Sequence, residues 1–90
     1  MGRETILFKS EEKKSAKEIS DTLRLIADKV DAGTLTLSRG SEEVVVDFPG
    51  QMTLELKVEE EQGRKLKKSL EIELEWIPGD TAESRGTTIS

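Results

Sequence analysis

The chain has 90 residues, of which 33% are hydrophobic and 37% charged, and its net charge is −5. It contains no Cys, His or Asn, which excludes disulfides, zinc centres with Cys or His ligands, thiol or imidazole catalysis and N-glycosylation. No apolar run approaches the roughly 18 residues of a membrane-spanning helix, and no charged-then-apolar leader opens the chain, so we expect a cytoplasmic protein without a membrane partner.

A short strand is predicted near the start of the chain. Residues 5–9 include the consecutive apolar residues Ile6, Leu7 and Phe8. The sequence leaves the place of this strand in a sheet open, and antiparallel pairing with the last strand is preferred.

A helix is predicted over residues 11–32. Its apolar residues recur at steps of four, three and four, which is typical of a helix with one buried face; they are Ile19, Leu23, Ile26 and Val30. Ser10 is the expected N-cap, because its hydroxyl can accept a hydrogen bond from an unpaired backbone N–H, and two glutamates follow it. Gly33 is the expected residue after the last turn, where a left-handed conformation is common.

Beyond Gly33 the apolar residues alternate with polar ones, which indicates strands with one covered face and one face in water. The alternating apolar residues are Leu35, Leu37, Val44, Val46, Phe48, Met52, Leu54, Leu56, Val58, Leu70, Ile72, Leu74 and Trp76. Three turns are expected to connect the strands: a two-residue turn at Gly40 and Ser41, and three-residue loops at 49–51 and 61–63. These turns would pair Leu37 with Val44, Val46 with Leu54, and Val58 with Leu66.

The predicted fold class is therefore α+β. One amphipathic helix would pack in two layers on an antiparallel sheet of four to five strands, in the order β-α-β-β-β-β. We expect residues 1–78 to form a single domain and residues 79–90, rich in Ser, Thr and Gly, to be a disordered tail. Because one helix covers only part of such a sheet, a homodimer is an expected partner state.

The last strand is the most distinctive segment of the chain. Residues 70–76 read Leu-Glu-Ile-Glu-Leu-Glu-Trp, and the chain also has an early Phe8-Lys9-Ser10 followed by the helix and a glycine-turned hairpin over residues 35–48. In these features, residues 4–78 resemble the Amphi-Trp domain, a small bacterial and archaeal family named for an amphipathic strand that ends in tryptophan. The resemblance implies kinship of fold; it implies no activity and no catalytic residues, since the family's function is uncharacterised.

Four apolar residues are candidates for an interface: Trp76, Ile77, Val45 and Leu7. Trp76 is in phase with the core, so we expect it to be buried against the helix or the first strand; alternatively, a partly exposed indole would anchor a partner. The other three are out of phase with the core, and together with an uncovered sheet edge they would mark a contact surface.

A basic cluster follows Gly63 and is the candidate anion-binding site. Its members are Arg64, Lys65, Lys67 and Lys68. They would bind a small anion, another ligand or a nucleic acid, although few aromatics and a negative net charge disfavour nucleic acid. The alternative is an ion-paired hairpin tip, in which Glu59 opposes Lys65.

Two further patterns carry the case for catalysis. Glu71, Glu73 and Glu75 share one strand face near Glu55, as carboxylates for acid–base chemistry or a hard cation would. An open, wet face provides neither a cleft nor converging oxygens, so a solvated charged surface is the simpler interpretation. Ser10-x-x-Lys13 matches a serine–lysine motif, but its companion motifs are absent and a helix cap explains the serine.

The sequence therefore predicts a non-catalytic protein-interaction or assembly module with no cofactor and no metal. The expected partner is a second copy or another protein whose identity the sequence does not reveal.

Overall fold

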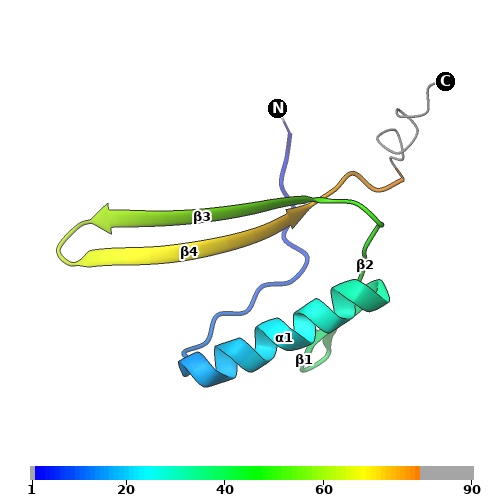
Figure 1. Cartoon of the computed structure of the whole chain (residues 1–90), viewed down its shortest axis with the longest axis horizontal. Coiled ribbons are helices and arrows are strands. Elements are labelled where there is room, and N and C mark those ends of the chain that lie inside the picture. Colours follow the sequence, from blue (N-terminus) through cyan, green and yellow to red (C-terminus); the bar gives the residue numbers. More distant parts are fainter. Residues whose placement is uncertain (1, 80–90) are drawn as a thin grey trace. The chain divides into compact units, whose positions relative to one another are not determined.

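The computed structural model describes residues 2–79, which form one helix and four strands (Figure 1). The elements are α1 (Ala16–Ala32), β1 (Thr34–Arg39), β2 (Glu42–Asp47), β3 (Thr53–Gln62) and β4 (Leu66–Glu75). They pair as two separate two-stranded antiparallel sheets, β1–β2 and β3–β4. The chain divides into two compact units between Phe48 and Pro49. The predicted α+β class is confirmed, whereas the predicted tail lies outside the described residues, apart from Gly79.

Helix α1 begins five residues later than predicted, so Ser10 is not its N-cap. The cap is Ser15, whose hydroxyl accepts a hydrogen bond from the Glu18 backbone N–H at 3.1 Å, while the Glu18 carboxylate accepts one from the Ser15 N–H at 3.0 Å. This reciprocal capping box satisfies two backbone donors at once. The residues between the two serines are all charged, so an extra helical turn there would bury no apolar side chain.

The predicted first strand is also wrong. Residues 2–15 form neither helix nor strand. Ile6 and Leu7 are 72% and 71% exposed. Three consecutive apolar residues favour a strand only where a neighbouring edge pairs with them, and no such pairing exists among the described residues.

Gly33 joins α1 to the first sheet, as the sequence predicted. Its φ of 98° lies in the left-handed region, and its N–H donates to the carbonyls of Lys29 and Val30. Its own carbonyl accepts a hydrogen bond from the Phe48 N–H at 2.9 Å. Hydrogen bonds of Gly33 thus connect the last turn of α1 to the end of the β1–β2 hairpin.

The β1–β2 hairpin has the predicted register. Arg39 opposes Glu42 and Leu37 opposes Val44, and Gly40 has a positive φ of 60° in the turn between them. Helix α1 packs against β1, and the side chains half-buried in this unit come from the helix and both strands. They include Ile26, Val30, Leu35, Leu37, Val44 and Val46.

The β3–β4 hairpin differs from its prediction in register. Val58 opposes Leu70 rather than Leu66, and the connecting loop is 63–65 rather than 61–63. The predicted register would set Lys57 against Lys67, whereas the observed one sets it against Glu71. Opposite charges across a strand pair are favourable and like charges are not, which explains the difference.

The predicted pairing across residues 49–51 is not among the strand pairs of the described residues, since β2 and β3 belong to different sheets. Residues 2–79 contain one helix, α1, and it is neither long enough nor apolar enough to cross a membrane.

Candidate functional site

The second unit presents an apolar strand face, which we call the hairpin apolar face. Strand pairing places its six members in three cross-strand rows: Leu54 with Leu74, Leu56 with Ile72, and Val58 with Leu70. Five of them are between 50% and 76% exposed, and Leu74 is half-buried. An apolar surface of this extent is costly in water and typically marks a contact surface.

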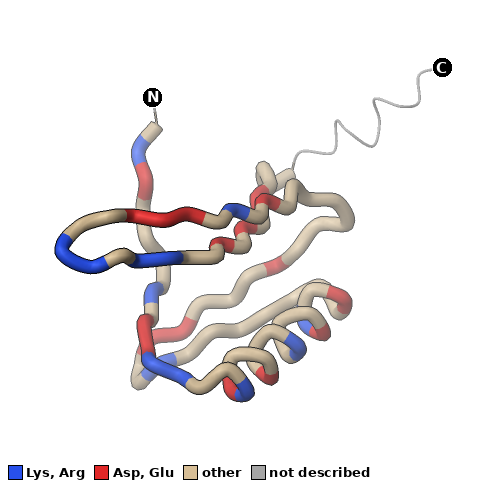
Figure 2. The backbone as a smooth tube through the Cα atoms, turned by 60° about the vertical axis from the view of Figure 1, so that its left-hand side comes forward, with Lys and Arg blue, Asp and Glu red and all other residues tan. Residues whose placement is uncertain are grey.

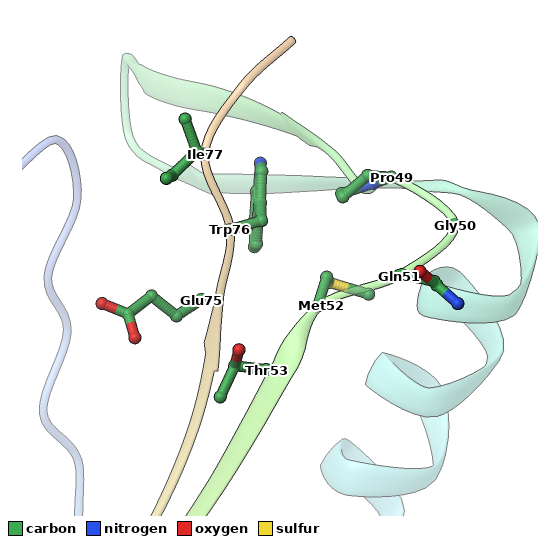
Figure 3. A pocket seen from close by; sticks show the side chains of 8 residues that line it. All are labelled: Pro49, Gly50, Gln51, Met52, Thr53, Glu75, Trp76 and Ile77. Carbon is green, nitrogen blue, oxygen red and sulfur yellow. The ribbon is translucent and has the colours of Figure 1, made fainter. Parts of the chain in front are cut away.

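A hollow of about 620 Å³ lies at the open end of the same hairpin (Figure 3). It is lined by Pro49, Gly50, Gln51, Met52, Thr53, Glu75, Trp76 and Ile77. In Figure 3 the indole of Trp76 lies on the side of Pro49 and Met52, whereas Glu75 and Ile77 point the other way. Trp76 is half-buried, so its indole is neither sealed in a core nor fully in water.

The candidate interface residues fall in both units. Trp76 and Ile77 come together at the hollow, and Ile77 is 68% exposed. Val45 is 58% exposed between two half-buried valines of β2, on the polar face as predicted. Leu7 lies in the irregular segment before α1 and is 71% exposed.

Two lining residues were missed as partners of Trp76. Met52 was assigned to the core and Pro49 to a turn. Continuing the observed register one step past Thr53 and Glu75 sets Met52 opposite Trp76, so the correct register would have identified it.

The basic cluster lies at the other end of the hairpin. Arg64 and Lys65 are in the turn, and Lys67 and Lys68 open β4. Figure 2 shows these basic residues beside an acidic stretch of β3. Lys68 Nζ lies 3.3 Å from Glu60 Oε2, so the tip contains a cross-strand ion pair.

The predicted partner at the tip was wrong, since Glu59 opposes Ser69. Acidic residues opposite Lys67 and Lys68 weaken the attraction of this cluster for a free anion.

The polar face of the β3–β4 hairpin contains two carboxylates opposite each other as well as an ion pair. Glu73 lies opposite Glu55. A hydrogen bond with Glu55 raises the pKa of Glu73, and the negative charges of Glu55 and Glu75 act in the same direction. Glu71 instead lies 3.5 Å from Lys57 Nζ and raises the pKa of that lysine.

No group of three or more carboxylates within residues 2–79 converges to hold a metal ion. The acidic strand face is therefore a set of solvent-exposed cross-strand pairs. The pair of Glu55 and Glu73 is repulsive when both carboxylates are ionised.

Comparison with known proteins gives a match at the level of family alone. Neither the curated proteins nor the solved structures include a match to this chain. The model of the Amphi-Trp domain matches residues 1–90, and β4, with its alternating leucine, isoleucine and glutamate residues, ends one residue before Trp76. The chain therefore belongs to the Amphi-Trp domain family.

Proposed function

We propose that the protein is a non-catalytic assembly module that associates with a second copy of itself. The observation that carries this proposal is the exposure of the hairpin apolar face, at 64% for Leu56 and 76% for Val58. A two-stranded hairpin is marginally stable alone in water. Its apolar face therefore requires a cover if the hairpin is to persist.

The helix supplies part of that cover in our proposal. The four strands would join into one antiparallel sheet, and α1 would pack on it as the second layer. The apolar face of α1 has exposed surface available for packing on the sheet, since Ile19 and Leu23 are 47% and 45% exposed.

A single helix is too narrow to cover the whole sheet. A helix is about 10 Å wide and strands lie about 4.8 Å apart, so one helix covers about two of four strands. The remaining apolar surface is what a second copy would cover.

The non-catalytic character of the proposal rests on side-chain chemistry. The chain has no His, Cys or Tyr, and its paired carboxylates lie on an open face, where no cleft concentrates a substrate. A chain without cysteine requires no oxidising compartment, which supports our assignment of the protein to the cytoplasm.

Sedimentation equilibrium from micromolar to millimolar protein tests this proposal. We expect the mean mass to rise above the 10.0 kDa of one chain, and the thermal midpoint to rise with concentration, because association stabilises the folded state. Trp76 fluorescence reports on the same transition. A mass of one chain at every concentration would refute self-association.

A further inference from the structure

The free edge of β4 is the strongest candidate for the contact between two copies. Within residues 2–79, β4 pairs with β3 alone. It is ten residues long and contains neither Pro nor Gly. The unpaired N–H and C=O groups along such an edge are a template for another strand.

The charges along β4 change sign from one end to the other. Lys65 precedes the strand in the turn and Lys67 stands at its start, whereas Glu73 and Glu75 stand at its end. Within the described chain, none of these four has an oppositely charged group within ion-pair distance, whereas Glu71 is paired with Lys57. Although Glu61 of β3 lies opposite Lys67, the charges without an ion pair are thus basic at and just before the start of β4 and acidic at its end.

We infer that β4 pairs antiparallel with β4 of a second copy, about a two-fold axis at Leu70. In this register Lys67 faces the second copy's Glu73, and Lys65 faces the second copy's Glu75. By symmetry each of these pairs forms twice. Each of these four charges then opposes one of the other sign, which stabilises a cross-strand pair where both residues lie in strands, as Lys67 and Glu73 do.

The same register brings most apolar residues of the opposite face together. Leu70 meets its own copy on the axis, Leu66 meets the second copy's Leu74, and the aliphatic stem of Lys68 lies against the second copy's Ile72. Both hairpin apolar faces then lie on one side of a four-stranded sheet, because the pairing keeps even-numbered residues opposite even-numbered residues. This inference rests on the proposed self-association and identifies the strand edge through which it takes place. The pairing adds strands to a hairpin that is marginally stable alone, while cover of the joined apolar faces is left to α1, as in the proposed function.

Neighbouring registers are less favourable. An axis at Glu71 sets that carboxylate against itself. An axis at Ser69 sets Lys67 against the second copy's Glu71, which is already paired with Lys57, and leaves Glu75 opposite the uncharged Gly63. A shift by one residue reverses the two faces of one strand.

The edge of β3 is also less favourable than that of β4. Its two registers that use the whole strand set Lys57 against itself, or Glu55 against Glu61. Like charges directly opposite destabilise a strand pair, so β4 is the better edge for association.

Cysteine cross-linking tests the position of the axis, since the native chain has no cysteine. Leu70→Cys would place two thiols directly opposite each other, within the Cα separation of about 4.4–6.8 Å that a disulfide needs. Leu66→Cys is the matched control. Its thiols would lie eight residues apart along the strands, about 26 Å. We expect mild oxidation to yield a covalent dimer from the first variant and not from the second.

Charge reversal tests the register independently. Lys67→Glu and Glu73→Lys each create two like-charge pairs, and we expect each to weaken dimerisation about tenfold or more. The double variant restores opposite charges and should return to within about threefold of the native dissociation constant. Circular dichroism of each variant confirms that the fold is retained.

The outcomes separate this inference from the proposed function. Two results would overturn the β4 contact but not self-association. One is a disulfide-linked dimer from Leu66→Cys and none from Leu70→Cys. The other is a dimer whose dissociation constant is unchanged by both charge reversals. A native chain that sediments as a monomer at every concentration overturns both. Cross-linking at Leu70 together with rescue by the double variant establishes the contact.

Discussion

The two units of this protein have the same alternating pattern but differ in what covers it. In the first unit, α1 packs against β1, and the apolar side chains on one face of β1 and β2 are half-buried. In the second unit no helix accompanies the hairpin within residues 49–79, and Leu56 on β3 is 64% exposed. Alternation therefore indicates which side of a strand is apolar, and the burial of that side depends on a separate element.

This contrast also separates the two units energetically. Burying apolar area stabilises a fold by about 25 cal/mol per Å², so a hairpin with an exposed apolar face gains little from its side chains. The first unit has a cover within its own sequence, whereas in our proposal the second is covered through association. Substitutions that compare equivalent positions in the two units can sharpen or break this view.

The largest expected effect comes from removing matched leucines. Leu37→Ala lies in the half-buried face of β1 and Leu56→Ala in the exposed face of β3. If association covers the second face, both should cost about 2–5 kcal/mol in urea denaturation of concentrated protein. If the face stays in water, Leu56→Ala should change stability by less than about 0.5 kcal/mol.

The next effect concerns the junction at the end of α1. Gly33 has a φ of 98°, whereas Gly50 has no positive φ, and an added Cβ would meet nothing within 4 Å at either residue. Gly33→Ala should therefore cost about 1–2 kcal/mol through backbone strain alone. Gly50→Ala is the control and should be neutral or stabilise by up to about 1 kcal/mol. Equal midpoints in thermal denaturation would contradict a strained junction.

The same contrast explains which parts of the fold could be predicted from the sequence. The β1–β2 register follows from one short turn, since Gly40 leaves little choice of loop. In the β3–β4 hairpin, a shift by an even number of residues keeps every apolar residue on the same face, so alternation does not distinguish the registers. The charge of Lys57 against Glu71 decides between them.

The candidate site shows a similar division. Trp76 could be singled out because it closes an alternating strand. Its neighbours at the hollow depend on the register, and Met52 was therefore assigned to the core instead. The predicted start of α1 differs from the observed one because Ser10 is followed by two glutamates, as an N-cap often is. Only Ser15 has a glutamate three residues later, and that glutamate directly precedes the first apolar residue of the helix face.

A smaller effect tests that helix start. Ser15→Ala removes the hydroxyl that accepts the Glu18 N–H, and should cost about 1 kcal/mol, as N-cap serines generally do. Ser10→Ala lies in the irregular segment and should change stability by less than about 0.5 kcal/mol. Thermal denaturation followed by circular dichroism measures both. A larger loss from Ser10→Ala would place the helix start at the earlier serine.

The smallest effect concerns the two opposed carboxylates of the second unit. The hydrogen bond with Glu55 raises the pKa of Glu73. The folded state therefore holds a proton that the unfolded state has released, and stability declines as the pH rises from the ordinary glutamate pKa through the raised pKa of Glu73. Glu55→Gln removes the facing charge, so the pKa of Glu73 should fall towards its ordinary value and this part of the pH dependence should disappear. Carboxyl NMR titration of the native and variant chains measures the change directly.

Lys57→Gln is the control, because that lysine pairs with Glu71, and its loss should leave the pKa of Glu73 raised. An unchanged pKa of Glu73 in Glu55→Gln would show that the two carboxylates do not share a proton. It would also contradict the placement of Glu55 directly opposite Glu73 in the β3–β4 register.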